Sequence, residues 1–440
     1  MLTRRLPHCF FLLPLLSTAS VSHAASTDPV STLAHTLIAL ALIIAFARLC
    51  GTALQRLLGQ PLVIGEIIAG ILLGPALLGK LLPGLHAFFF PASILPFLSL
   101  LATLGVVLFM FLVGMALNPQ ELRERGPAAA AVASGGMLLP MLGGIGLAWM
   151  LYPEFTPAGT SASSFGFFLC ISLAVTAFPV LARLIEERQL IGTSTGAIAM
   201  TAAALGDAAA WGLMFACILL SGHGNHSYGA MAAGFLTLAL ILPPAWRWSR
   251  QHGEASNNQH HMALIGAGLL LAAGAAEVSG LHAVMGAFLF GLVLPHEGRL
   301  SQNLRPQVEQ VATSLLLPAF FAMLGTQLQL DELHSGDLPI FALIMLVAMG
   351  GKVGGSYIAA RLAGLENGLA RSVAILMNTR GLMELVVLKI GLDLQLINGR
   401  LFTLMVLMAL ITTLITPLLL DLFAPRRQAE PLTDASSTAE

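Results

Sequence analysis

The stretch VTAFPVLARLIEERQLIGTSTGAIAMTAAALGDAAAW, residues 175–211, predicts two adjacent transmembrane helices joined by a short charged turn. The first helix carries Pro179 in its interior, where proline removes one backbone hydrogen bond and clashes with the preceding turn. The second helix is largely apolar but holds a single carboxylate, Asp207. If this helix spans residues 193–221, Asp207 lies about 14 residues from either end, at about 1.5 Å per residue. That position is near the midplane of the bilayer.

A carboxylate at this depth is costly and therefore informative. Insertion of an acid at the centre of a membrane helix costs about 2.5–3.5 kcal/mol. Ion-coupled transporters combine such an acid with a broken helix near the midplane. The stretch therefore predicts an ion-transport site.

The composition is that of a polytopic membrane protein. The 440 residues are 57% hydrophobic and 10% charged, and the mean hydropathy is +0.85, whereas a soluble domain has about 25% charged residues. The net charge of -1 gives no indication of a nucleic-acid partner. No G-x-G-x-x-G follows an expected strand, so we expect no nucleotide-binding regulatory domain and no cofactor. The four cysteines show neither metal-ligand spacing nor a disulfide framework.

The two ends of the chain are expected to lie outside the helical bundle. Residues 1–24 combine two arginines, an apolar run and small residues, which is typical of a signal peptide cleaved after Ala24. The alternative is an uncleaved first helix, although the run is too short to span comfortably. Residues 424–440 are polar and predict a disordered cytoplasmic tail.

Between these ends, apolar runs predict about thirteen membrane spans. Their limits are near 31–55, 61–79, 93–117, 127–151, 164–187, 192–221, 229–246, 262–277, 281–296, 308–330, 338–362, 368–392 and 399–423. With the N-terminus outside, nearly all arginines fall in connections on the inner side, as the positive-inside rule requires. We therefore expect a multi-pass protein of the cell (inner) membrane with a cytoplasmic C-terminus.

A second interrupted span is predicted at Leu376-Met377-Asn378-Thr379-Arg380-Gly381-Leu382-Met383-Glu384, midway through the twelfth apolar run. The preceding span holds Lys352 between two pairs of glycines, and small residues let another backbone approach closely. The fourth to sixth and eleventh to thirteenth spans thus each contain one broken helix and one intramembrane charge. The two triplets begin on opposite sides of the membrane, which is the arrangement of an inverted repeat.

Two crossed broken helices would leave four half-helix ends near the midplane. Their N-terminal ends are partly positive and their C-terminal ends partly negative, so Asp207 can neutralise the former and Lys352 the latter. One alternative is that both charges do only this. We favour a second role, in which Asp207 holds either a proton or a monovalent metal ion, because competition for one acid is enough to produce exchange. Thr176 and carbonyls freed near Pro179 would supply neutral oxygen ligands.

Other polar residues are expected to support the crossing. Asn378 and Thr379 would either support the ion ligands from behind or satisfy backbone groups freed at the opposite break. Arg380 and Glu384, four apart, can pair on one helix face. Glu66 lies about five residues from the inner end of its span and is read as structural or as part of an entrance.

The segments GEIIAGILLGP, AVTAFPVLARLIEE, AMTAAALGDAAAW, GAFLFGLVLP, MNTRGLMELVVLKIG and LFTLMVLMALITTLITP resemble the type-2 branch of the monovalent cation:proton antiporters. The resemblance covers nearly the whole chain after residue 24. It implies a sodium/proton antiporter fold, an all-α membrane protein of thirteen helices with two crossed discontinuous helices. It also implies exchange of sodium or potassium for protons, with a role in pH homeostasis, and it assigns the cation and proton to Asp207 and a compensating charge to Lys352.

The resemblance further implies a homodimer in the membrane lipid with a moving core and a fixed scaffold. The cation/proton exchanger domain would cover residues 25–423. The core would comprise about 127–221 and 338–423, the dimerisation scaffold about 31–117 and 262–330, and a linker helix about 229–246.

One residue departs from the family pattern. Many members have Asp, Asn or Gln immediately before the essential aspartate, where this chain has Gly206. One-for-one electroneutral exchange and exchange of two protons per cation both remain open, the latter requiring Lys352 to release a proton. The alternative function is a cation channel or ion-coupled symporter on a similar fold. An enzyme is not expected, because no nucleophile-base or metal-ligand spacing occurs.

Overall fold

The computed structural model describes residues 29–58, 62–116, 126–190, 193–221, 228–252, 259–279, 282–294, 299–328 and 330–423. This described part is helical and contains no strand. Eight of its helices are long and apolar enough to cross a membrane, and shorter apolar helices accompany them. In lipid every backbone polar group must be satisfied within the protein, which a helix does within its own segment.

The described residues up to Val278 form ten α-helices. They are α1 (Pro29–Leu58), α2 (Leu62–Leu73), α3 (Pro83–Phe89), α4 (Leu95–Ala116), α6 (Gly126–Leu151), α7 (Ala162–Ala174), α8 (Phe178–Glu187), α9 (Ser194–Ser221), α10 (Tyr228–His252) and α11 (Gln259–Val278). A π-helical turn, Pro75–Gly79, continues α2.

The described residues from Ala283 to Phe423 form eight further α-helices. They are α12 (Ala283–Val293), α13 (Arg299–Val311), α14 (Leu317–Thr326), α15 (Asp337–Met345), α16 (Gly351–Leu362), α17 (Asn367–Leu376), α18 (Leu382–Asp393) and α19 (Gly399–Phe423). A π-helical turn, Leu346–Gly350, joins α15 to α16 directly before Lys352, so the two form one continuous span.

The helices follow the predicted spans closely, with three differences. Pro179 is the second residue of α8 rather than an interior residue of a longer helix. The first N–H groups of a helix have no partner within the helix, so the missing N–H of proline costs no hydrogen bond there. The short helix α3 was not predicted. Helix α13 extends the tenth span with the polar sequence RLSQNLRPQVEQV, which has no apolar run to reveal it. The predicted signal peptide and the predicted tail after Phe423 lie outside the described residues.

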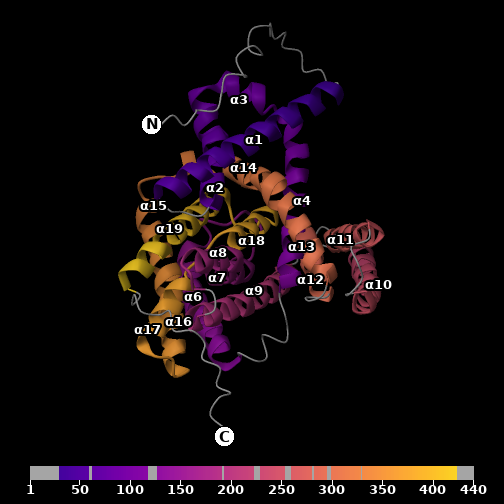
Figure 1. Cartoon of the computed structure of the whole chain (residues 1–440). Helices are drawn as coiled ribbons and strands as arrows, with labels where there is room; N and C mark the ends of the chain where they lie inside the picture. Colours follow the sequence, from indigo (N-terminus) through magenta and orange to yellow (C-terminus); the bar gives the residue numbers. More distant parts are fainter. Residues whose placement is uncertain are drawn as a thin grey trace, which may run out of the picture.

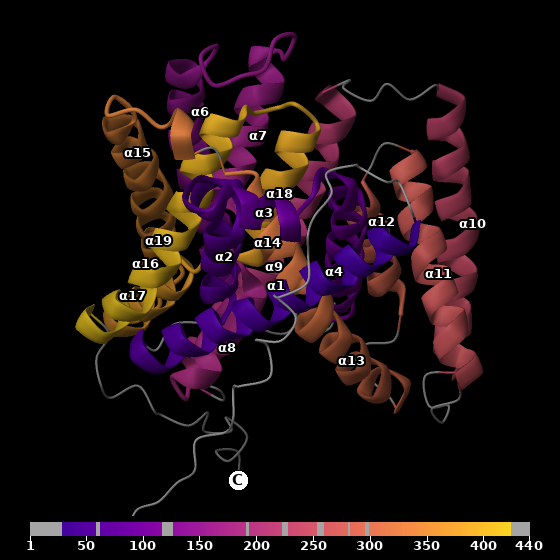
Figure 2. The same cartoon turned by 90° about the horizontal axis from the view of Figure 1, so that it is seen from above.

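The helices pack in two groups. Helix α6 packs against α16, α7 and α9, and α17 packs against α9, α16 and α19. In the other group α2 packs against α1 and α14, while α4 packs against α12 and α14. Figure 1 shows α7, α8 and α18 near the centre of the molecule, with α15–α17 on one side and α10 and α11 on the other. Figure 2 shows the same order, with α10 beside α11 at the edge.

Candidate ion site at two interrupted helices

The two interruptions meet inside the bundle. Helix α7 ends at Ala174 and α8 begins at Phe178, while α17 ends at Leu376 and α18 begins at Leu382. The Ala177 N–H in the first interruption donates to the carbonyl oxygen of Thr379 in the second, at 3.0 Å. One direct backbone hydrogen bond therefore joins two segments about 200 residues apart in the chain.

Close approach at the crossing requires a glycine. A Cβ atom on Gly381 would lie 2.7 Å from Cγ2 of Val180 in α8, which is shorter than any ordinary carbon–carbon contact. On the other side of the interruption, the Thr379 hydroxyl donates to the Leu376 carbonyl at 2.7 Å. That bond satisfies one of the carbonyls left open at the end of α17.

The negative end of α7 is covered by two cations. The Lys352 ammonium donates to the carbonyl oxygen of Ala174, the last residue of the helix. The Arg380 guanidinium donates to the carbonyls of Leu173 at 2.7 Å and Ser172 at 3.3 Å. Both side chains are fully buried. They supply positive charge where the helix dipole is negative and satisfy three terminal carbonyls.

Arg380 also holds a buried carboxylate. Its Nη1 lies 2.9 Å from Oε1 of Glu384, and neither side chain is exposed. Glu384 lies in the first turn of α18, where negative charge is favourable. The carbonyl of Arg380 accepts from the Thr413 hydroxyl of α19 at 2.8 Å, so the interruption is fixed to its neighbour.

Asp207 lies at the positive end of α8. Its carboxylate interacts with the backbone amide of Phe178, the first residue of that helix, and with the charge of Lys352. The Phe178 amide faces the carboxylate without closing a hydrogen bond of ordinary geometry, since neither carboxylate oxygen has a partner within the described residues. Asp207 is 1% exposed, 13 residues after the start of α9 and 14 before its end.

A second buried oxygen lies in the connection between α7 and α8. The Thr176 hydroxyl, two residues before Phe178, is 1% exposed and has no hydrogen-bond partner among the described residues. Buried polar groups in native proteins are almost always paired. Unpaired oxygens on Thr176 and Asp207 are therefore available to a bound proton or cation.

Asn378 ties the second interruption to α19. Its side-chain amide donates to the Thr416 hydroxyl at 3.1 Å, and its own Oδ1 oxygen has no partner in the described part of the chain. The residue is fully buried. Asn378 therefore contributes one fixed contact and one free acceptor to the crossing.

The glycines around Lys352 position its helix against α6. A Cβ on Gly355 would lie 2.1 Å from the carbonyl oxygen of Gly135, and a Cβ on Gly351 would lie 2.8 Å from Cα of Pro140. The two backbones are thus in direct contact, as small-residue interfaces in membranes permit. This packing carries Lys352 into the crossing.

Glu66 does not belong to the crossing. It is buried on α2 and lies 3.7 Å from Arg48 of α1, whose guanidinium also donates to the Thr313 carbonyl at 2.9 Å. Two other residues of α2, Ile64 and Ile67, border a small cavity of about 10 Å³ beside Gly381. Glu66 therefore pairs with a residue of its own group of helices, the group that contains α1, α2, α4, α12 and α14.

Two features of the site were not predicted. Arg380 covers the end of α7, whereas the sequence predicted only its pairing with Glu384. Trp211, one turn after Asp207 on α9, stacks on Phe288 of α12 with ring centroids 6.0 Å apart. Residues four apart share a helix face, so the face of α9 that bears Asp207 is directed toward the other group of helices. The sequence signal for this contact was a tryptophan four residues after the acid in an apolar helix.

Among the described residues no cluster of three His, Cys, Asp or Glu side chains is placed to hold a metal ion. The crossing holds two carboxylates, Glu384, which is paired with Arg380, and Asp207, which has no hydrogen-bond partner within the described residues.

A helical membrane bundle in which two interrupted helices cross beside a buried acid and a buried base has the architecture of an ion-coupled secondary transporter. Residues 41–423 match the family described as "Sodium/hydrogen exchanger, transmembrane". The chain belongs to this family, whose members are transporters and not enzymes.

The relatives and the fold agree with this assignment. The chain is 38% identical over 392 residues to the Na⁺/H⁺ antiporter NhaS4 of Synechocystis sp., covering 87% of this chain and 95% of that protein. It is 34% identical over 407 residues to Cation/H⁺ antiporter 20 of Arabidopsis thaliana, covering 88% of this chain and 48% of that protein. The chain thus spans about half the length of this plant relative. The fold matches the sodium proton antiporter MjNhaP1 of Methanocaldococcus jannaschii with a TM-score of 0.58 at 15% identity, over 88% and 96% of the two chains.

Proposed function

We propose that the chain is a secondary antiporter that exchanges a monovalent cation, sodium or potassium, for protons across the cell membrane. Asp207 would hold a proton and a cation alternately, with Thr176 as a neutral ligand. The observation that carries the proposal is the buried carboxylate of Asp207, whose two oxygens have no hydrogen-bond partner within the described residues. Such a group needs either a proton or a positive ion, because an unpaired charge in low dielectric is costly.

The charges around Asp207 support this division of roles. Lys352 and Arg380 are engaged with carbonyls of α7, and Glu384 is engaged with Arg380. Asp207 is the carboxylate at the crossing of which neither oxygen has a hydrogen-bond partner within the described residues. When Asp207 loses its proton, a bound cation can therefore neutralise the negative charge that remains.

We further propose that the protein is a homodimer in the inner membrane, with its N-terminus outside. Transport would proceed by alternating access, as the core (about 127–221 and 338–423) moves against the scaffold (about 31–117 and 262–330). The linker helix, about 229–246, would join the two. The stack of Trp211 on Phe288, between α9 and α12, would then be a contact that breaks and re-forms.

The test is proton movement in proteoliposomes with an imposed pH gradient. Sodium, potassium and lithium are added in turn, and dequenching of a pH-sensitive dye reports exchange. The proposal expects dequenching with at least one cation in the wild type. A channel would pass the cation without the coupled proton movement, and absence of dequenching with every cation would overturn the proposal.

A further inference from the structure

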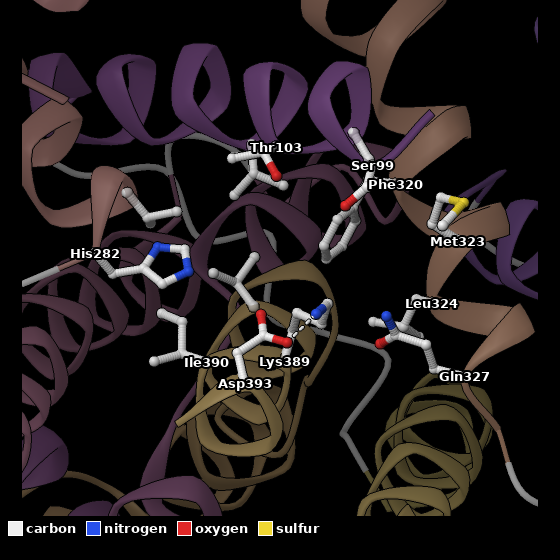
Figure 3. Close-up of a pocket in the computed structure, with 14 residues that line it drawn as sticks. Ser99, Thr103, His282, Phe320, Met323, Leu324, Gln327, Lys389, Ile390 and Asp393 are labelled. Carbon is white, nitrogen blue, oxygen red and sulfur yellow. Dashed lines mark hydrogen bonds and ion pairs between the residues drawn. The ribbon is translucent and has the colours of Figure 1, made fainter. Parts of the chain in front are cut away.

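A polar cavity lies away from the crossing, between the two groups of helices. Figure 3 shows it bounded by α4, by α14 and by α18, with His282 at one end just before α12. Its volume is about 70 Å³, enough for several water molecules, since about 10–15 Å³ suffices for one. Asp393, the last residue of α18, borders it, and this end of α18 lies on the outer side in the proposed orientation.

The polar groups of this cavity are mostly oxygen acceptors. Ser99 and Thr103 of α4 contribute hydroxyl groups, Gln327 contributes an amide, and Asp393 contributes a carboxylate. The Gln327 Oε1 atom is buried and has no partner within the described residues. Hard cations prefer such oxygen ligands.

His282 adds a nitrogen to the same cavity. Its Nδ1 atom is buried and unpaired within the described part of the chain. Three charged side chains interact with the ring, namely Glu277 of α11 and Lys389 and Asp393 of α18. Glu277 is already engaged with the Ala283 N–H at 2.7 Å. The free ring nitrogen can hydrogen-bond to a water molecule in the hydration shell of a cation.

The carboxylate of Asp393 is occupied by a tethered cation. The Lys389 ammonium, one turn earlier on α18, pairs with its Oδ1 atom. The two side chains are 24% and 43% exposed, so the pair is partly hydrated and contributes little to stability. A free cation can therefore displace the ammonium at little cost.

We propose that this cavity is a second binding site for a partly hydrated monovalent cation, with Asp393 as its carboxylate ligand and Lys389 as a built-in competitor. The site deepens the proposed function, on which its role in transport rests. It would concentrate the cation on the outer side before the core exposes Asp207 to that side. It therefore acts on the apparent KM at one face of the membrane.

The first test measures exchange in right-side-out and inside-out vesicles separately. For Asp393→Asn we expect the apparent KM for the cation to rise about three- to tenfold at the outer face, since one carboxylate is lost from a partly hydrated site, with no change at the inner face. For Lys389→Gln we expect a lower KM at the outer face. The matched control is Asp421→Asn, which also removes one carboxylate from a surface pair, with Arg188, and we expect no change at the outer face.

The second test detects the site without transport. Sodium NMR line broadening is measured on purified protein, with thallium(I) binding as the substitute for potassium. Asp207→Asn should retain part of the broadening, and Asp207→Asn/Asp393→Asn should lose it. Loss of all cation binding in Asp207→Asn alone, or an equal KM change at both faces in Asp393→Asn, would overturn the inference. Failure of exchange in the wild type would instead count against the proposed function and leave this binding result to decide the second site.

Discussion

The Lys352 ammonium donates a hydrogen bond to the carbonyl oxygen of Ala174, a residue 178 positions earlier in the chain. This contact joins the base-bearing helix α16 to the open end of the interrupted helix α7. It gives the intramembrane lysine a structural partner that is not a carboxylate. We therefore predict that this contact affects both the stability of the crossing and the proton stoichiometry of the proposed exchange.

The first prediction concerns the stability of the crossing. Lys352→Met keeps the length of the side chain but leaves the Ala174 carbonyl without its donor, and an unsatisfied buried group costs about 1–3 kcal/mol. We expect a lower midpoint of thermal unfolding in detergent. Lys389→Met is the matched control, because its partly exposed pair with Asp393 contributes little. An equal midpoint in the two variants would contradict the contact.

The second prediction concerns stoichiometry. If Lys352 stays protonated and keeps donating to the Ala174 carbonyl throughout the cycle, Asp207 supplies one proton for each cation. We therefore expect that an imposed membrane potential, without a pH or cation gradient, drives no exchange. A clear response to the potential would indicate a second titrating group and would favour two protons per cation.

The third prediction concerns the buried pair of Arg380 and Glu384. Arg380→Leu leaves the carboxylate of Glu384 buried without its partner, and breaking a buried pair in this way costs about 3–5 kcal/mol. The double variant Arg380→Leu/Glu384→Leu removes both charges and should be less destabilised than Arg380→Leu alone. Chemical unfolding of the three proteins measures the difference. A double variant less stable than the single one would contradict this prediction and would show that Glu384 stabilises the start of α18 without Arg380.

The fourth prediction compares two neighbouring glycines on α16. A Cβ on Gly355 would lie 2.1 Å from the Gly135 carbonyl oxygen, whereas the nearest atom to a Cβ on Gly354 is Cδ2 of Leu139, at 3.7 Å. Gly355→Ala must therefore push α6 and α16 apart, and we expect loss of stability and of exchange. Gly354→Ala should be tolerated, with a gain of about 0.5–1 kcal/mol in helix stability. Similar behaviour of the two variants would contradict the α6–α16 packing.

The fifth prediction concerns Gly206, the residue directly before Asp207. A Cβ on Gly206 would find no atom nearer than the Met137 sulfur, at 4.0 Å. Gly206→Ala should therefore fold and exchange like the wild type, with thermal unfolding and dye dequenching as the measurements. A severe loss in this variant would mean that Gly206 is needed for a movement of α9 rather than simply tolerated.

Much of the fold follows from the length of apolar runs. Spans such as 399–423 coincide with the observed helix α19, because lipid requires about twenty apolar residues per crossing. The polar extension α13 and the short helix α3 escape this signal, since neither is a long apolar run. The central depth of Asp207 in α9 was predictable for the same reason, as it needs only the two helix ends.

The partners of each charge were harder to predict. Arg380 reaches the α7 carbonyls only because the two interruptions cross. The sequence does not indicate which half-helix end lies beside which side chain. Spacing revealed the local pair with Glu384 but not the contacts with Leu173 and Ser172. The cavity near Asp393 likewise combines residues from four separate elements. Such contacts depend on tertiary packing, which no local pattern specifies.

The most direct measurement of the central claim is proton release when a cation binds to the purified protein in weakly buffered detergent. If proton and cation compete for Asp207, adding the transported cation to the protonated wild type releases protons, and Asp207→Asn releases none. Proton release that persists in Asp207→Asn would contradict the account, because another group would then be the site of exchange.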